Sequence, residues 1–563
     1  MLRFRNSLLH FSTCVIFLGI SLSSCGPAYM PDTISGIVID ENGPVKDAVV
    51  RVQTTENHTT TDINGKFTLS GLDASQAATV TAWKSGFFIA GEQNVMPGMT
   101  DVEIHLEAHA KSDNPDYVWL SALFHPGQGE DQGCAECHSN VNTNIPFTLP
   151  VDEWLQDAHS QSSINPRFLT MYTGTDMLGN QSPLTRYVSN RDYGRFPLGP
   201  DPGQPYYGPG YKLDFPDTSG NCAACHVPAA SINNPYSMDP ITVSGVPAEG
   251  VPCDFCHKIW DAHLDPISGL PYANMPGVLS YEFRRPPEGH QFFAGPLDDV
   301  APGEDTYSPL QQQSQFCAPC HFGVFWDTVI YNSFGEWLES PYSNSETGQT
   351  CQDCHMPPGL TDHFTRLEEG GLIRDPDTIF SHLMPGASDE AFLQNAVAMS
   401  VEAWRENGNI VLQVDITNDN TGHHIPTDSP LRHMILWVQV SDSLGNQLEQ
   451  LDGPTIPDWG GIGKPSQGYY AGLPGTIYAK VLQELWSEKT PTGAYWNPTR
   501  VLSDNRIPAL ETDSTSYRFS APKEGPATLE VVLVFRRAFI ELIEEKGWDV
   551  PDIIISQQII VLK

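Results

Sequence analysis

Spare cysteines are absent from this sequence, although its 563 residues include twelve cysteines. Ten of the twelve belong to five copies of the pattern Cys-x-x-Cys-His, and the other two are Cys14 and Cys25. An exported protein usually uses paired cysteines for disulfide bonds. Because none is left for that purpose, the five copies require another chemical explanation. They consist of Cys134, Cys137 and His138; Cys222, Cys225 and His226; Cys253, Cys256 and His257; Cys317, Cys320 and His321; and Cys351, Cys354 and His355.

Basic residues are also scarce. The 30 lysines and arginines stand against 68 aspartates and glutamates, which gives a formal net charge of −38. Proteins that bind nucleic acid need basic surfaces to neutralise phosphates, so this composition excludes that class of partner. We expect the acidic surface to serve solubility rather than to bind one specific basic partner.

Long hydrophobic runs are missing as well, with one short exception at the start. Arg3 and Arg5 precede an apolar run over residues 8–22, which is too short for a membrane span and typical of an export signal. The following Leu22-Ser-Ser-Cys25-Gly26 resembles the lipobox of bacterial lipoproteins. That resemblance implies removal of residues 1–24, lipidation of Cys25 and a tether over 25–32. The alternative is an ordinary signal peptide with an incidental cysteine.

Residues 33–108 have the rhythm of a small β-sandwich, with short strands separated by turns such as Glu41-Asn-Gly-Pro44 and Asp62-Ile-Asn-Gly65. The stretches SGIVIDENGPVKDAVV, TTTDINGKFTLSGL and VTAWKSGF resemble the carboxypeptidase regulatory-like domain. The resemblance implies a seven-stranded sandwich without catalytic residues. We interpret it as a spacer or docking module.

The remaining chain divides into two further parts, so we predict a multidomain protein. Residues 110–400 contain all five motifs and are rich in proline, glycine and aromatic residues, which predicts a loop-rich, mainly α domain. Residues 401–563 return to alternating apolar patterns, such as MILWVQV and ATLEVVLVFR, which predict a C-terminal β-sandwich.

Two internal regularities suggest duplication in the central part. The first cysteines of successive motifs are 88, 31, 64 and 34 residues apart, a rhythm that pairs the second motif with the third and the fourth with the fifth. The segment Glu153-Trp-Leu-Gln-Asp-Ala-His159 recurs as Glu336-Trp-Leu-Glu-Ser-Pro-Tyr342. A tyrosine thus replaces a histidine in the second copy.

The motif Cys-x-x-Cys-His is the attachment sequence of haem c. Two thiols at this spacing add to the two vinyl groups of the porphyrin, and the adjacent imidazole reaches the iron. A closed zinc site would more naturally combine two Cys-x-x-Cys pairs, and five pairs would leave one over. A redox disulfide would not require the histidine every time. We therefore expect five covalently bound haem c groups, with the five motif histidines as proximal ligands.

The second axial ligand decides what each iron does. Histidine gives a saturated electron carrier, whereas an open position permits substrate chemistry. Several histidines outside the motifs are available. They are His125, His159, His263, His290, His363, His382, His423, His424 and His433.

A family resemblance narrows this choice. The segments GVPCDFCHKI, FGEWLESPY, GQTCQDCHMP, SHLMPG and TGHHIPTDSPLR resemble exported multihaem c-type cytochromes in the style of cytochrome c554 and hydroxylamine oxidoreductase, over about residues 115–563. The resemblance implies that His159, His382 and His423 are distal ligands. We add His125 and His290, with His263 and His363 as competitors. Asp428 departs from the family, which has glycine in this loop.

These observations predict an exported, lipid-anchored pentahaem cytochrome at the outer membrane or cell surface, facing the periplasm or the exterior. It would carry electrons between a membrane-linked donor and an external or periplasmic acceptor, with other cytochromes as redox partners, and would not be an enzyme. One alternative is a multihaem reductase of a small nitrogen or sulfur oxyanion with one open haem. Tyr342 favours it, and the lack of a Cys-x-x-Cys-Lys motif opposes it. Another is a self-assembling structural subunit of a cytochrome filament or surface complex.

Overall fold

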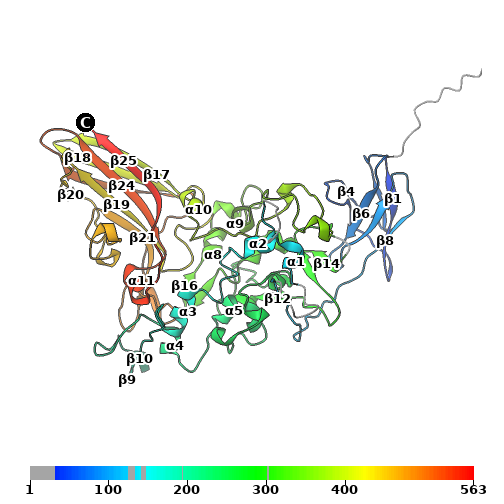
Figure 1. The fold of residues 1–563 in the computed structure, drawn as a ribbon, viewed down its shortest axis with the longest axis horizontal. Coiled ribbons are helices and arrows are strands. Elements are labelled where there is room, and N and C mark those ends of the chain that lie inside the picture. Colours follow the sequence, from blue (N-terminus) through cyan, green and yellow to red (C-terminus); the bar gives the residue numbers. More distant parts are fainter. Residues whose placement is uncertain (1–31, 124–132, 141–146, 193, 301–302) are drawn as a thin grey trace, which may run out of the picture.

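The computed structural model describes residues 32–123, 133–140, 147–192, 194–300 and 303–563. The expected signal segment, Cys25 and His125 lie outside these residues. Figure 1 shows an elongated molecule, with a β domain at one end, a loop-rich body in the middle and a second β domain at the other end. Within the described part of the chain, no helix has the length and apolar character needed to cross a membrane.

The N-terminal domain contains two four-stranded sheets, one with the order β2-β1-β5 plus β8 beside β1, and one with the order β4-β3-β6-β7. Apolar residues that are fully buried, among them Ile34, Val38 and Val80, fill the space between the sheets. The resemblance implied seven strands, and the two-residue strand β2 brings the number to eight. The strands are β1 (Ile34–Asp40), β2 (Gly43–Pro44), β3 (Val49–Val52), β4 (His58–Thr60), β5 (Lys66–Leu69), β6 (Ala78–Trp83), β7 (Ala90–Val95) and β8 (Val102–His105).

Polar contacts fasten this domain to the body of the molecule. The Arg51 guanidinium lies 2.8 Å from the carboxylate of Asp298. The neighbouring Asp299 accepts a hydrogen bond from the backbone N–H of Thr54 and pairs with Arg374 at 2.8 Å. The side chains of Asp299 and Arg374 are both at most 5% exposed. Arg51 and Thr54 thus join the N-terminal domain to Asp298 and Asp299 of the body, and the buried partner Arg374 fixes the position of Asp299 within the body.

The central body is loop-rich as expected, but the prediction that it is mainly α is not confirmed. Its described helices are four to eight residues long and alternate with four two-stranded sheets. Frequent prolines remove the N–H groups that a longer helix needs. The helices are α1 (Ala135–His138), α2 (Pro150–Trp154), α3 (Pro166–Thr173), α4 (Tyr211–Asp214), α5 (Ala223–His226), α6 (Pro228–Ser231), α7 (Cys253–Cys256), α8 (Ser333–Leu338), α9 (Cys351–His355) and α10 (Glu390–Gln394). The strands are β9 (Tyr187–Asn190), β10 (Gly194–Pro197), β11 (Ile259–Ala262), β12 (Tyr281–Phe283), β13 (Phe293–Gly295), β14 (Asp305–Tyr307), β15 (Gly323–Phe325) and β16 (Thr328–Tyr331).

The C-terminal domain is a sandwich of a four-stranded sheet, β17-β18-β23-β20, and a five-stranded sheet, β22-β21-β19-β24-β25. Ile410, Leu412, Val414 and Ile416 alternate along β18 and are fully buried against the facing sheet. One helix, α11 (Ile540–Lys546), lies between the last two strands. The strands are β17 (Ala398–Glu406), β18 (Asn409–Thr417), β19 (His433–Ser441), β20 (Gln450–Asp452), β21 (Gly475–Glu484), β22 (Thr499–Asp504), β23 (Thr512–Ser520), β24 (Ala527–Arg536) and β25 (Ile553–Leu562).

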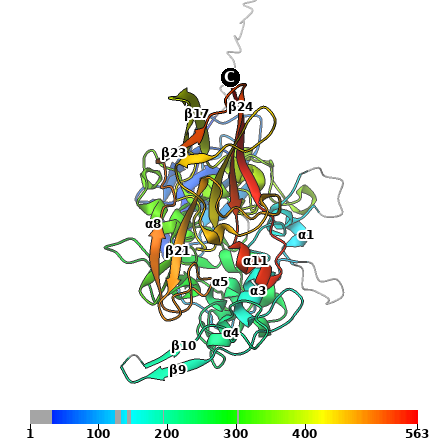
Figure 2. The ribbon, with the colours of Figure 1, turned by 90° about the vertical axis from the view of Figure 1, so that its left-hand side faces the viewer.

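Seen from its C-terminal end, the sandwich overlies the central body, with α11 next to α3 (Figure 2). Lys546 at the end of α11 makes this contact, since its Nζ donates to the carbonyl oxygens of Thr170 and Thr175 at 3.0 Å. The loop between β18 and β19, residues 418–432, also reaches the body. Through this loop the C-terminal domain contributes residues to the motif region.

Candidate functional site

All five Cys-x-x-Cys-His motifs adopt the same local structure, a single helical turn. The backbone N–H of the histidine donates to the carbonyl oxygen of the first cysteine in the first four motifs, at 2.9 to 3.1 Å, and the fifth motif lies in α9. Residues three and four apart share one face of a helix. Each turn therefore presents two thiols and one imidazole on the same side. The ten motif cysteines are free thiols in the structure.

Four of the motif histidines are oriented by a backbone carbonyl. The Nδ1 atoms of His138, His257 and His355 lie 2.7 Å from the carbonyl oxygens of Phe364, Ala294 and Pro385, respectively. His226 makes the same contact with Ser162 at 3.3 Å. Because a carbonyl only accepts, Nδ1 carries the hydrogen and Nε2 keeps its lone pair. This is the arrangement found in metal-bound histidines.

His321 of the fourth motif differs from the other four. Its Nδ1 faces a carboxylate oxygen of Asp428 at 3.5 Å. Burial alone would lower the pKa of His321, but the hydrogen bond and the charge of Asp428 outweigh burial and raise the pKa to about 9. Asp428 has a φ of 68°, a left-handed conformation that favours glycine. The sequence marked this position as a departure from the family without revealing its partner.

Two of the histidines expected as distal ligands face a motif histidine. The ring centroids of His159 and His321 are 6.3 Å apart, and so are those of His423 and His355. A metal–histidine bond of about 2.0–2.1 Å puts two imidazoles that share one metal ion at a centroid separation of about 6 Å. The Nδ1 atoms of His159 and His423 contact Asp157 and the carbonyl of His424. Their Nε2 atoms are therefore available for a shared ion.

His382 lies near the first and third motifs. Burial, followed by the electrostatic influence of His257 and His138, lowers its pKa to about 4. Its backbone N–H donates to Glu153 at 2.7 Å, and the same carboxylate accepts from Ser381. The Nδ1 atom of His382 is buried and has no hydrogen-bond partner among the described residues. His382, which follows the fifth motif in the sequence, thus lies beside the first and third motifs in the structure.

The two copies of the Glu-Trp-Leu segment play equivalent roles. Trp154 Nε1 donates to the carbonyl of Val251, and Trp337 Nε1 donates to that of Gln349; each acceptor stands two residues before the first cysteine of a motif. Glu153 accepts the N–H of His382, and Glu336 accepts that of His424. The sequence analysis noticed the repeated segment but missed these positioning glutamates, which the repetition itself could have indicated.

This equivalence also changes the interpretation of Tyr342. In the first copy, His159 faces the histidine of the motif that follows the copy's own motif. Tyr342 stands at the corresponding place in the second copy, and no Cys-x-x-Cys-His follows His355 in the sequence. The correspondence therefore pairs Tyr342 with none of the five motif histidines, although its phenol lies within electrostatic range of Cys354 in the fifth motif.

The other candidate histidines differ in their surroundings. His290 lies at the surface with 53% of its side chain exposed and contacts Glu304 at 2.7 Å, and His263 is half-exposed beside Glu282. His363 is buried, with Nδ1 2.6 Å from Asp362 and with no described partner for Nε2. By this geometry His363 is better placed for a ligand role than His290, and His125 lies outside the described residues.

The five motifs form one connected group. Cys134 and Cys253 lie close enough for each thiol to perturb the pKa of the other, and the same is true of Cys225 with Cys320 and of Cys317 with Cys351. The side chain of Gln311, just before the fourth motif, donates to the carbonyl of Cys256 in the third. The fourth motif is thus the junction of the second, third and fifth, and the first joins through the third.

Close backbone contact supports this connectivity. The N–H of Gly277 donates to Pro319 in the fourth motif, and a Cβ at Gly277 would lie 2.3 Å from the Ala224 carbonyl oxygen in the second. Ala224 of the second motif also shares a hydrophobic cluster with Phe255 of the third, so the second motif has neighbours in both the third and the fourth. Chain separation does not determine which loops meet in space.

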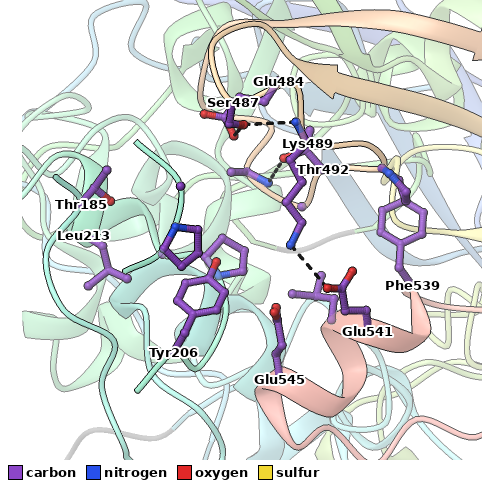
Figure 3. Close-up of a pocket in the computed structure, with 18 of the residues that line it drawn as sticks. Thr185, Tyr206, Leu213, Glu484, Ser487, Lys489, Thr492, Phe539, Glu541 and Glu545 are labelled. Carbon is purple, nitrogen blue, oxygen red and sulfur yellow. Dashed lines mark hydrogen bonds and ion pairs between the residues drawn. The ribbon is translucent and has the colours of Figure 1, made fainter. Parts of the chain in front are cut away.

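A separate cavity of about 720 Å³ lies between residues 183–214 and the C-terminal domain (Figure 3). Carboxylates of Glu484, Glu541 and Glu545 line it, and Lys489 lies 4.0 Å from Glu541. No motif cysteine or motif histidine lines this cavity. It is therefore distinct from the candidate site.

The donor set fits haem c. Each motif offers two free thiols and one imidazole whose Nδ1 is occupied by an acceptor, and two motifs have a second imidazole at the separation expected for a shared iron. The described residues contain no group of three or more His, Cys, Asp or Glu side chains arranged around one metal position.

Comparisons with known proteins distinguish the N-terminal domain from the rest of the chain. Residues 33–107 match the carboxypeptidase regulatory-like domain, which confirms that resemblance. The comparison with curated proteins found no match. Among solved structures, a penta-haem cytochrome c552 from Thermochromatium tepidum is 18% identical with a TM-score of 0.50, covering 76% of this chain and 97% of that chain. A cohesin–X-dockerin complex from Acetivibrio cellulolyticus is 22% identical over 14% of this chain and 58% of that chain, with a TM-score of 0.12. The chain therefore carries a carboxypeptidase regulatory-like domain in front of a body whose fold is similar to that of this penta-haem cytochrome.

Proposed function

We propose that this protein is an exported pentahaem c-type cytochrome that carries electrons between a membrane-linked donor and an external or periplasmic acceptor. Haem c, when bound, supplies one-electron redox chemistry. The motif cysteines would attach the five groups, and His138, His226, His257, His321 and His355 would be their proximal ligands. Other cytochromes are the redox partners that this role implies.

The observation that carries the proposal is the close grouping of all five motifs. Gln311 Nε2, just before the fourth motif, donates to the Cys256 carbonyl in the third, and Ser314 Oγ accepts from the Cys351 N–H in the fifth. Gly277 lies between the second motif and the fourth, and the Cys134 thiol of the first lies beside that of Cys253 in the third. A carrier requires its redox groups to be close neighbours, whereas a set of independent sites does not. Because the fourth motif neighbours the second, the third and the fifth, its haem would be the branch point of the electron-transfer path.

The second axial ligands support a carrier rather than a catalyst. His159 and His423 face the histidines of the fourth and fifth motifs at the separation of shared ligands. We propose His382 as the distal ligand of the first or the third motif, whose histidines His138 and His257 both lie within electrostatic range of it. Histidine on both sides of an iron saturates it and lowers its potential relative to methionine ligation. His363, His125 and His290 are the candidates for the remaining two motifs.

We also propose lipidation of Cys25 and a location at the outer membrane or cell surface. The support is the sequence of the first 26 residues, since a lipid-anchored chain needs an export signal followed by a lipidated cysteine. The N-terminal β domain would then stand between the tether and the motif body, as its position in Figure 1 allows. Both β domains offer surfaces for assembly into a filament or surface complex.

A reductase with one open haem is the second candidate, and the surroundings of His226 favour it. Among the described residues, no histidine ring faces His226 as His159 faces His321. The ring of Phe168 stacks on His226 instead. The phenols of Tyr331 and Tyr495 lie within electrostatic range of Cys222 in the same motif. Tyrosines beside an open iron would supply hydrogen bonds to a bound oxyanion.

Replacement of His159 or His423 by alanine tests the ligand scheme. We expect each variant to retain five covalent haems and to convert one low-spin signal into a high-spin signal in electron paramagnetic resonance. His290→Ala is the matched control, because it removes a histidine at the surface and should leave the spectrum unchanged. An unchanged spectrum in His159→Ala and His423→Ala would remove those residues from the ligand set.

A further inference from the structure

The fourth motif is chemically distinct from the other four in one respect. Backbone carbonyls face the Nδ1 atoms of His138, His226, His257 and His355, whereas a carboxylate, that of Asp428, faces the Nδ1 atom of His321 at 3.5 Å. A carbonyl presents a partial negative charge and a carboxylate presents a full one. A full charge at this distance acts more strongly where the surroundings exclude water.

The loop that carries Asp428 is built to hold the carboxylate in this place. Ser333 Oγ donates to the other carboxylate oxygen at 3.1 Å, so both oxygens have partners. The backbone of Asp428 keeps a φ of 68°, although a side chain is disfavoured there. Strain retained at a non-glycine residue points to a function for its side chain. Glycine would relieve the strain and lose the charge.

The other charged groups around Asp428 leave His321 as its principal partner. Arg432 acts on Asp428 through space, and its own Nη1 donates to the Thr427 carbonyl at 3.3 Å. Among the residues that the structure describes, Asp428 forms an ion pair with His321. Tyr331 and Tyr495 face the same region as neutral phenols. The carboxylate charge is therefore directed mainly at the imidazole of the fourth motif.

We propose that Asp428 is a positioning residue that gives His321 more anionic character than any other motif histidine and makes the iron bound there the one most stabilised in its oxidised state. The inference rests on the proposed function, since it requires His321 to hold a haem iron. Because the fourth motif is the junction of the second, third and fifth, a low potential at this place would make it the least populated by electrons. Transfer between branches would then depend on Asp428.

The test is a potentiometric titration of the complete, lipid-free holoprotein and of the variants Asp428→Asn and Asp428→Gly. Asparagine keeps the size and tolerates the left-handed backbone, and glycine relieves it; both remove the charge. We expect one of the five one-electron steps to move to higher potential by a tenfold change in its equilibrium constant, about 59 mV, in both variants. Asp442→Asn, in a surface turn of the sandwich, should move none.

A second readout identifies the haem concerned. In a His159→Ala background the fourth haem is expected to be high-spin, so its iron–histidine stretching band becomes visible in resonance Raman spectra, and Asp428→Asn should lower that frequency. Five unchanged potentials together with an unchanged band would overturn the role of Asp428 while leaving the proposed function intact. A shift in Asp428→Gly that is absent in Asp428→Asn would also overturn it, since relief of the backbone strain, and not loss of the charge, would then be the cause. A wild-type chain without a haem at the fourth motif would refute both.

Discussion

Glu336 is the residue on which the second Glu-Trp-Leu copy depends. Its carboxylate is 2% exposed and lies 2.7 Å from Arg506, while its other oxygen accepts from the Thr427 hydroxyl and from the backbone N–H of His424 at 3.3 Å. Glu336→Gln keeps the shape, but turns one of the two acceptor atoms into a donor that faces other donors. A hydrogen bond to a charged group contributes about 1.5–3 kcal/mol. Arg506 keeps its contact with Asp504, so we expect a local loss in this range rather than global unfolding.

Native-state hydrogen exchange measures this loss directly. The opening free energy of residues 421–428 should fall by about 1.5–3 kcal/mol, which corresponds to exchange roughly 10- to 150-fold faster, since about 1.4 kcal/mol equals a factor of ten. Glu339→Gln is the control, because Glu339 is exposed at the end of the same helix and surface substitutions change stability by about 0.5 kcal/mol or less. Exchange within threefold of the wild type in Glu336→Gln would refute the positioning role.

Two further predictions concern the sandwich and the membrane anchor. Burial, followed by the charge of Arg536, lowers the pKa of His433 from 6.5 to about 3, so the unfolded chain takes up a proton below pH 6.5 that the native chain does not. The unfolding free energy should therefore fall by about 1.4 kcal/mol per pH unit between pH 6.5 and about 3; His433→Gln should flatten the fall in melting temperature between pH 7 and pH 5, and an unchanged slope would contradict this assignment. Cys25→Ala should release the protein from membranes in a fractionation assay, and retention would contradict the proposed lipidation.

The sequence predicts the local features of the site better than their arrangement in space. The five motifs define their own helical turns, because the spacing of two cysteines and a histidine fits one turn. The repeated Glu-Trp-Leu segment signals duplication, and the structure shows why: each copy supports one motif and one histidine segment. His159 and His423 were expected as ligands through a family resemblance, and the structure brings each to a motif histidine.

The features that could not be predicted from the sequence depend on contacts between residues far apart in the chain. The spacing of the motifs does not indicate that the second meets the fourth, because that contact runs through Gly277 in a distant loop. The partner of Asp428 is equally hidden, since His321 lies in another domain. The mainly α expectation for the centre failed because proline and glycine divide the chain into short turns, which the motifs need but which do not extend into long helices.

The central claim is that five haem irons are held by histidine on both sides in one connected carrier. An electron paramagnetic resonance spectrum of the oxidised protein, with a haem count per chain and a carbon monoxide titration of the reduced form, tests it most directly. The account predicts five covalent haems, all low-spin and none binding carbon monoxide. A high-spin haem that binds carbon monoxide would contradict it and would direct assays of oxyanion reduction to the motif of His226.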